Sequence, residues 1–244
     1  MVRMSWVPLL TGISITSVLC LTGCDKTSKL SNPQKWALAV SAIPKKAGGM
    51  DLDILGGGEA DSDYIETLKN MLKRDWDIQD RAGAQKCLKD LKEEGHRKRF
   101  SDMAKDVTPL DAQAFETVLS KIPNQPEVQA QLQFVRKHSA PLGAKGIIGW
   151  DLCRVIYLAE CCARAGFITE EEAWREIMPT AKLVQTTFSS WEDMSANYLL
   201  GREFWSGTNN PRILAAERTL RSDKNSPWVR LPWNLPLEIT PGKP

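Results

Sequence analysis

The sequence predicts an all-α fold: a single globular domain of about eight to ten helices, followed by an extended C-terminal tail with tryptophan and proline. Apolar residues recur at intervals of three and four from residue 61 onward, as they do in amphipathic helices. Capping residues or prolines precede most of these segments, and no segment shows the clear alternation of a strand. Hydrophobic residues make up 42% of the chain and nine residues are tryptophan, so a packed core is expected rather than disorder.

The predicted helical domain covers residues 32–222. Asn32-Pro33 opens its first helix, because proline is favoured at the first helical position. Residues 44–60, which contain the run Leu55-Gly56-Gly57-Gly58, predict a flexible or tightly turned loop. A phosphate-binding loop is disfavoured there because no Lys-Ser/Thr follows the glycines and no strand precedes them.

The remaining helices are predicted from their N-terminal signals and their apolar spacing. Their starts are expected, in chain order, at residue 61, Asp80, Thr108-Pro109, Gln125-Pro126, Ile147, Thr169, Ser190 and Asn210-Pro211. Gly95 is expected to end the helix that Asp80 begins. Thr169 and Glu172 form a capping-box pattern, and Pro179 is expected to kink or restart the helix that follows.

The C-terminal tail, residues 223–244, differs from the domain because its frequent prolines favour an extended path. Two roles are open for Trp228 and Trp233. They pin the tail onto the helices, which is the preferred interpretation, or they form an arm that docks onto a partner.

The N-terminal segment resembles a bacterial lipoprotein signal. Leu21-Thr22-Gly23-Cys24 matches a lipobox, and a single charge, Arg3, precedes the 20 uncharged residues from Met4 to Gly23. We therefore expect residues 1–23 to be a signal peptide, Cys24 to be lipidated, and residues 24–31 to be a tether. The alternative is a single transmembrane helix, although this segment is only weakly apolar for that role.

The expected location is the bacterial cell envelope, with the domain lipid-anchored on the periplasmic side. Asp25, directly after the lipidated cysteine, resembles a signal that retains lipoproteins in the inner membrane. Loss of residues 1–23 removes Arg3, which leaves 31 basic and 30 acidic residues. A nucleic-acid partner is not expected from such a balance.

The four cysteines that remain after Cys24 show whether disulfides, which an envelope location permits, are possible. They are Cys87, Cys153, Cys161 and Cys162. On one helix, Cys153 and Cys161 would stand about 12 Å apart, too far for a disulfide. At most one bridge is therefore possible, through Cys87, and buried free thiols are the preferred interpretation. With two histidines and no Cys-x-x-Cys, neither a metal site nor another cofactor is expected.

Two clusters could carry function. Gly149-Trp150-Asp151-Leu152-Cys153-Arg154 places Asp151 and Arg154 one turn apart in an otherwise apolar helix, where charges are costly unless they are paired. The second cluster is Trp191, Tyr198, Arg202 and Trp205, whose spacing puts all four on one helix face. Gly201 inside that helix is tolerable where a backbone or ligand approaches closely.

Several motifs together resemble a bacterial family, domain of unknown function twelve sixty-six. They are Leu55-Gly56-Gly57-Gly58, Trp76-x-Ile78, Asp80-Arg81, Gly95-His96-Arg97, Gly-Trp-Asp-x-x-Arg from residue 149, residues 166–174, and Ser-Trp-Glu-Asp from residue 190 with Tyr-Leu-Leu-Gly-Arg-x-x-Trp from residue 198. The resemblance covers roughly residues 35–207. It implies a shared fold and no particular activity.

Three interpretations of the two clusters remain open. Asp151 and the arginines form a structural pair, or Trp150, Asp151, Arg154 and the second cluster line a groove that binds a protein or peptide. The groove suits a membrane-anchored accessory or immunity-like module. The third interpretation is a hydrolase that uses Asp151 with Arg154 or Arg202, but no triad or paired carboxylates support it, so no catalytic residue is assigned.

Overall fold

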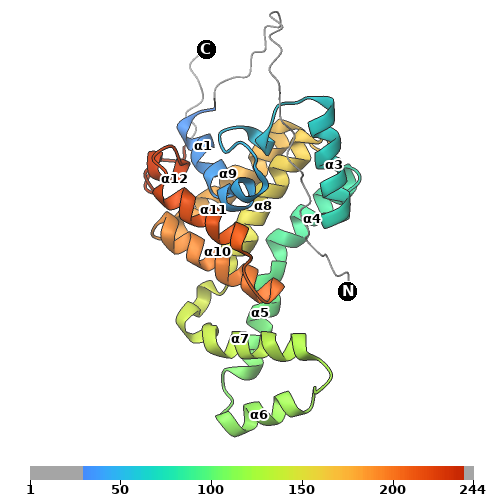
Figure 1. Ribbon diagram of the computed structural model, residues 1–244, viewed down its shortest axis with the longest axis vertical. Coiled ribbons are helices and arrows are strands. Elements are labelled where there is room, and N and C mark those ends of the chain that lie inside the picture. The colour runs from blue at the N-terminus through green and yellow to red at the C-terminus, as the bar shows by residue number, and fades with distance from the viewer. Residues whose placement is uncertain (1–29, 239–244) are drawn as a thin grey trace, which may run out of the picture.

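The computed structural model describes residues 30–238, which form α-helices and two short 3₁₀ helices without any strand (Figure 1). The predicted all-α fold is confirmed. Ten of the α-helices in this part of the chain have eight residues or more. They are α1 (Asn32–Ala39), α3 (Ser62–Trp76), α4 (Arg81–Glu93), α5 (Gly95–Val107), α6 (Ala112–Ser120), α7 (Pro126–Leu142), α8 (Ile148–Arg164), α9 (Glu170–Thr187), α10 (Trp191–Ser206) and α11 (Pro211–Ser222).

Four shorter elements complete the described chain: α2 (Ala42–Gly48), α12 (Pro227–Arg230), η1 (Leu55–Gly57) and η2 (Gly143–Lys145). The predicted signal segment and Cys24 lie outside the described residues. Within residues 30–238, no helix is both long and apolar enough to span a bilayer.

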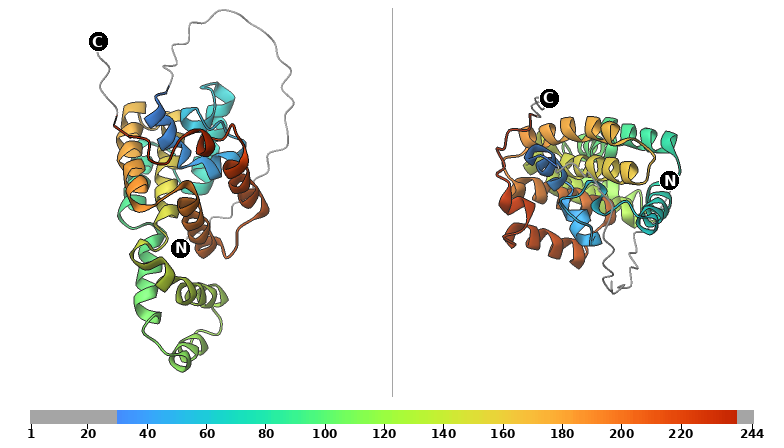
Figure 2. Two further views of the ribbon diagram at one scale, coloured as in Figure 1. Left: turned by 90° about the vertical axis from the view of Figure 1, so that its left-hand side faces the viewer. Right: turned by 90° about the horizontal axis from the view of Figure 1, so that it is seen from above.

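Helix α8 is the centre of the larger part of the molecule, where α9 and α10 pack along it (Figures 1 and 2). It is rich in apolar residues, and it is buried on nearly all sides rather than along one stripe. Its packing against α10 is very close at two glycines. A Cβ on Gly201 would stand 2.3 Å from the Cβ of Trp150, and one on Gly149 would stand 2.8 Å from Asn197 Oδ1. The glycine expected to permit a close approach therefore does so for a neighbouring helix.

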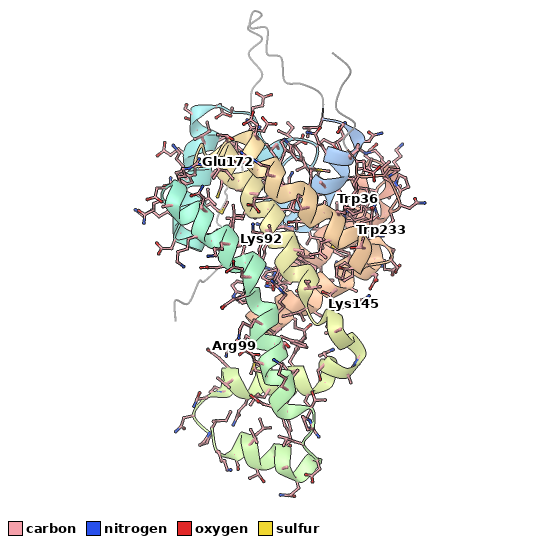
Figure 3. All side chains as sticks on the ribbon, turned by 180° about the vertical axis from the view of Figure 1, so that it is seen from behind. Trp36, Lys92, Arg99, Lys145, Glu172 and Trp233 are labelled. Carbon is pink, nitrogen blue, oxygen red and sulfur yellow. The ribbon has the colours of Figure 1, made fainter. Side chains whose placement is uncertain are left out.

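A cluster of four tryptophans holds the C-terminal tail against the body. Trp191 stacks on Trp228 with ring centroids 5.7 Å apart, and Trp233 packs edge-on against both Trp36 and Trp191. Trp228 Nε1 donates to the Ala39 carbonyl at 2.8 Å. Figure 3 shows Trp36 and Trp233 side by side on the body. The expectation of an extended tail is wrong over Pro227–Arg230, which form the single turn α12, because a proline at the first helical position is compatible with a helix. The tryptophans pin the tail in place, which is the preferred interpretation.

The lower part of the molecule has its own apolar cluster (Figures 1 and 2). Helix α5 leaves the main body and packs with α6 and α7, and Arg99 on α5 donates to Gln131 on α7 at 2.7 Å. The buried members of this cluster are Phe100, Val107, Phe115, Leu119, Leu132, Val135, Ile147 and Phe204. Because Phe204 belongs to α10, this lobe is joined to the main body through packing as well as through α5.

Most of the predicted helix starts are confirmed by their caps. Asp80, Thr169, Ser190 and Asn210 each accept a backbone N–H of the first turn. Pro179 does not restart the chain, because α9 continues through it as one helix. The helix expected at Thr108-Pro109 begins later, at Ala112, where Asp111 supplies the cap.

Helix α5 was not foreseen. Gly95 ends α4 as predicted, with a left-handed φ of 57°, but a new helix starts at once rather than after Thr108. Only Phe100 and Val107 of α5 are buried, so its apolar periodicity is weak.

Candidate functional site

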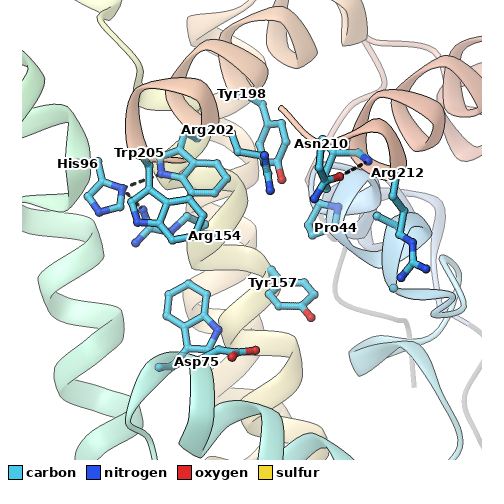
Figure 4. Close-up of a pocket in the computed structure, with 15 residues that line it drawn as sticks. Pro44, Asp75, His96, Arg154, Tyr157, Tyr198, Arg202, Trp205, Asn210 and Arg212 are labelled. Carbon is cyan, nitrogen blue, oxygen red and sulfur yellow. Dashed lines mark hydrogen bonds between the residues drawn. The ribbon is translucent and has the colours of Figure 1, made fainter. Parts of the chain in front are cut away.

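A cavity of about 220 Å³ opens between α2, α3, α5, α8, α10 and α11 (Figure 4). Its walls are mainly aromatic, from Trp76, Trp150, Tyr157, Tyr198 and Trp205, and three arginines and one aspartate also line it. Figure 4 shows His96 and Arg212 at opposite sides, with Tyr198 and Arg202 above Tyr157 and Asp75. We call this cavity the aromatic pocket.

Beneath the pocket, the Asp151 carboxylate caps the N-terminus of α5. It is fully buried and accepts the backbone N–H groups of His96 at 3.0 Å and Arg97 at 2.9 Å. The unsatisfied N–H groups and the positive dipole at a helix start both favour an anion there. Asp151 thus does for α5 what a local capping residue does for other helices.

Two guanidinium groups complete the partners of Asp151. Nη1 of Arg97 lies 3.3 Å from one carboxylate oxygen, and Nη1 of Arg154 lies 3.2 Å from the other. Together with the two backbone donors, these contacts occupy the roughly four acceptor positions of a carboxylate. The aspartate and arginine of the Gly-Trp-Asp-x-x-Arg motif are therefore paired, and no acceptor position is left for a water or substrate.

The glycine of Gly95-His96-Arg97 is required by this contact. Its φ is positive, and an added Cβ would stand 2.3 Å from Asp151 Oδ2. Arg97 also donates through Nη1 to the Leu91 carbonyl at 2.8 Å and through Nη2 to the Lys92 carbonyl. The same three-residue motif thus closes α4, opens α5 and pairs with α8.

His96 is a neutral acceptor in the pocket wall. Its Nδ1 lies 2.8 Å from both Trp150 Nε1 and Arg154 Nη1, two groups that can only donate. Burial, together with the positive charges of Arg154 and Arg99, lowers the pKa of His96 to about 3. The ring is also stacked with Trp150 and Trp205, with both centroid separations at 6.3 Å.

Arg154 is held between two indole rings, with its guanidinium carbon 5.0 Å from the Trp150 ring centre and 5.3 Å from that of Trp76. Such cation–π contacts are strongest where water is excluded. Burial lowers the pKa of Arg154, and the nearby Asp151 carboxylate opposes that shift. With its charge paired and its guanidinium against two indole rings, Arg154 serves to fix the pocket wall.

Arg202 differs from Arg154 because no carboxylate pairs with it in the described chain. Its side chain is buried, with the residue 6% exposed, and its hydrogen bonds to described residues leave only from Nη1: to the Thr208 carbonyl at 3.0 Å and to Ser206 Oγ at 3.4 Å. Burial lowers its pKa, but arginine keeps its charge in proteins. The pocket therefore contains a buried, uncompensated positive charge.

The two predicted clusters are brought together only in part. Trp150, Arg154, Tyr198, Arg202 and Trp205 line the aromatic pocket, and Asp151 lies directly behind it. Trp191 lies elsewhere, in the tryptophan cluster that holds the tail. Of the two arginines expected beside Asp151, Arg154 pairs with it, whereas Arg202 bonds elsewhere and Arg97 takes the other carboxylate oxygen.

Site residues that were not proposed from chemistry include Asp75, Trp76, His96, Arg97, Tyr157 and Arg212. Trp76, His96 and Arg97 stand in motifs that carry the family resemblance, whereas Asp75, Tyr157 and Arg212 stand in none of them. The four cysteines Cys87, Cys153, Cys161 and Cys162 are free thiols. No group of three potential metal-binding side chains is found among residues 30–238.

Comparison with known proteins gives a family without an assigned activity. Residues 71–233 match the family described as "Protein of unknown function (DUF1266)". A relative from Escherichia coli (strain K12), "Uncharacterized protein YbeR", is 23% identical over 151 residues, which cover 62% of this chain and 63% of the relative. The chain thus matches less than two thirds of that relative's length. No solved structure matches.

Proposed function

The chain belongs to the DUF1266 family of proteins of unknown function, and from its geometry we propose that it is a binding protein. In this proposal it takes a protein or peptide partner at the aromatic pocket. A lipid on Cys24 anchors it in the bacterial envelope. The observation that carries this proposal is the combination of five aromatic side chains with the uncompensated guanidinium of Arg202. Aromatic residues and arginine contribute most of the energy at binding interfaces.

The pocket is also preorganised, which favours binding. The Trp150 ring is fixed by its hydrogen bond to His96, and Trp205 stacks on Trp150 with ring centres 5.7 Å apart. Walls that are already ordered lose little conformational entropy when a ligand arrives. The hydrolase alternative gains no support from the site, because every acceptor position of Asp151 is occupied within the protein.

The membrane part of the proposal rests on the lipobox and on the short distance between Cys24 and the first helix. Seven residues separate Cys24 from α1, which begins at Asn32. Even fully extended, they would reach about 25 Å. A lipid on Cys24 would therefore keep the helical domain close to the bilayer surface, within reach of membrane-proximal partners.

Site-specific crosslinking tests the binding site. A photoreactive amino acid is placed at Arg212, an exposed position at the pocket, or at Lys89, an exposed position on α4 outside it. We expect a defined adduct in living cells from position 212 that is absent from position 89 and is lost when Trp205→Ala is added. Equal adducts at both positions, or no effect of Trp205→Ala, would reject the pocket as the binding site.

Mass spectrometry of the purified full chain tests the anchor. We expect a diacylglycerol mass on Cys24 as the new first residue, and we expect Cys24→Ser to abolish both the modification and membrane association. An unprocessed N-terminus on the wild-type chain would contradict the anchor without affecting the pocket.

A further inference from the structure

The aromatic pocket has a composition that restricts what it can hold, and this inference rests on the binding function proposed above. We propose that the pocket recognises an aryl carboxylate: a single aromatic ring that packs among the tryptophans, with one carboxylate on the guanidinium of Arg202. This ligand group can be a free small acid or the C-terminal aromatic residue of a peptide.

The volume of the pocket suits a ligand group with one ring. An engineered apolar cavity of about 150 Å³ accommodates benzene, whereas pockets for drug-sized ligands measure about 300–1,000 Å³. At about 220 Å³ the aromatic pocket lies between the two. The stacked rings of Trp150 and Trp205 form one aromatic wall, against which a planar ring can pack.

The charges at the pocket favour an anionic ligand. Two of the charged residues at the pocket are already compensated: Arg154 by Asp151, and Asp75 by Arg74 at 2.7 Å. Arg202 and Arg212 then remain, and neither forms an ion pair with a described residue. Nε and Nη2 of Arg202 make no hydrogen bond to the described residues, and two adjacent guanidinium N–H groups match the two oxygens of a carboxylate.

The start of helix α11 also favours an anion in the pocket. Helix α11 begins at the pocket, where Asn210, Arg212 and Ile213 line it, so the positive end of its dipole faces the cavity. Burial raises the pKa of Tyr198 well above that of free tyrosine, so its hydroxyl group stays protonated. Around Arg202 the pocket therefore offers groups that suit an anionic oxygen.

A carboxylate fits better than a phosphate. Phosphate sites use several donors to satisfy three strongly accepting oxygens, often backbone N–H groups at a helix start. Here the start of α5 is already occupied by Asp151, and the Ile213 N–H at the start of α11 is taken by Asn210 Oδ1 at 2.9 Å.

The test measures the affinity of the full-length chain for a series of ligands, by tryptophan fluorescence and by calorimetry. The probes are 3-phenylpropionate, its neutral amide, phenyl phosphate, and hexanoate as an acid without a ring. We expect 3-phenylpropionate to bind and the amide to bind roughly 10- to 100-fold more weakly, the usual effect of losing a hydrogen bond to a charged group. Hexanoate is expected to bind more weakly than the aryl acid.

Variants locate the carboxylate. Arg202→Gln is expected to weaken 3-phenylpropionate roughly 10-fold or more while leaving the affinity of the amide nearly unchanged. Arg202→Lys keeps the charge but loses the planar fork, so it should recover only part of the affinity. Should Arg202→Gln fail to fold, the comparison of acid and amide on the wild-type chain still decides the proposal.

Peptides ending in phenylalanine, with a free or an amidated C-terminus, identify the source of the ligand. If the peptide with a free C-terminus binds tightly and the amidated peptide does not, the ligand is a peptide C-terminus. If 3-phenylpropionate binds and neither peptide does, the ligand is a free small acid. Equal affinities for acid and amide, tighter binding of phenyl phosphate, or no binding of any aryl acid would overturn the proposal. A crosslink at position 212 that persists in that last case would leave the general binding function intact.

Discussion

Helix α8 carries two buried carboxylates, Asp151 and Glu160, and their surroundings differ in an informative way. Glu160 accepts Lys45 Nζ at 2.7 Å, Ser41 Oγ at 2.5 Å and the Gly56 N–H at 3.2 Å. The Lys45 and Glu160 side chains are each 1% exposed. One cation pairs with one anion in a site closed to solvent. These contacts hold η1, which contains Gly56, and α2, which contains Lys45, against α8.

Asp151 is equally buried but meets two arginines, Arg97 and Arg154, whose side chains are 23% and 14% exposed. Beyond it lies the aromatic pocket, where Arg202 adds a further positive charge. Glu160 therefore forms a closed structural contact, whereas Asp151 supports the wall of a site that has positive charge to spare. Both carboxylates are buried to the same degree, so the two regions differ in the balance of charge around each carboxylate.

The largest expected effect is at the sealed pair. Lys45→Met should lower the free energy of unfolding by about 3–5 kcal/mol, because Glu160 would be left buried without a counter-charge. The midpoint of thermal unfolding should fall by about 6–20 °C, measured by circular dichroism. Lys46→Met, at the exposed neighbour, should change stability by less than about 0.5 kcal/mol. A double variant Lys45→Met/Glu160→Leu that is no more stable than Lys45→Met would contradict this account.

Asp151→Asn should cost somewhat less, about 2–3 kcal/mol, because its two arginine partners retain some contact with solvent. The amide offers one accepting oxygen where four donors converge, so the start of α5 should lose part of its cap. Hydrogen exchange should show faster exchange at the first turn of α5. Asp90→Asn, in an exposed pair with Lys86, is the matched control and should be nearly neutral. Normal stability of Asp151→Asn together with lost binding would instead assign Asp151 directly to the site.

Substitution of two glycines, Gly95 and Gly166, distinguishes the cost of backbone strain from the cost of crowding against Asp151. Gly95 and Gly166 both have positive φ, but an added Cβ meets Asp151 only at Gly95, and it meets nothing within 4 Å at Gly166. Gly166→Ala should cost about 1–2 kcal/mol from the left-handed backbone alone. Gly95→Ala should cost about 1–2 kcal/mol more, since the carboxylate must also move. Equal losses measured by urea unfolding would show that the close contact is unimportant.

These contacts also explain how far the sequence could predict the structure. Helices α9, α10 and α11 were predicted at their starts because Thr169, Ser190 and Asn210 are local caps. Helix α5 was missed because its cap, Asp151, comes from another helix far along the chain. A local reading of the sequence has no access to such a partner.

The same limit applies to the site. The spacing of Tyr198, Arg202 and Trp205 correctly placed them on one face of α10, but Trp191 lies two turns before Tyr198, where α10 already faces the tail. Helical periodicity predicts which residues share a face and leaves open which neighbour each one meets. His96 could be found only through its motif, since a lone histidine on a polar segment carries no chemical signal of its own.

The dependence of stability on acid pH distinguishes the pocket wall from the lobe. His96 has a pKa of about 3 in the folded chain, below its ordinary value of 6.5, so the folded state binds fewer protons there than the unfolded state. Its contribution is therefore complete above pH 6.5 and is lost as the pH falls from there toward 3. By pH 5 the loss should be about 2 kcal/mol at most.

His96→Asn keeps an accepting atom near Nδ1 for Trp150 and Arg154 but cannot titrate. Its free energy of unfolding, measured in urea, should therefore fall less steeply than that of the wild type between pH 7 and pH 5. His138 lies on α7 of the lobe, and burial lowers its pKa in the same direction. Because His138 accepts no hydrogen bond from an indole or guanidinium of the described residues, His138→Asn should flatten the profile less. Parallel profiles for the wild type and His96→Asn would mean that His96 takes up a proton without disturbing the pocket wall, and that Trp150 and Arg154 do not depend on its neutral form.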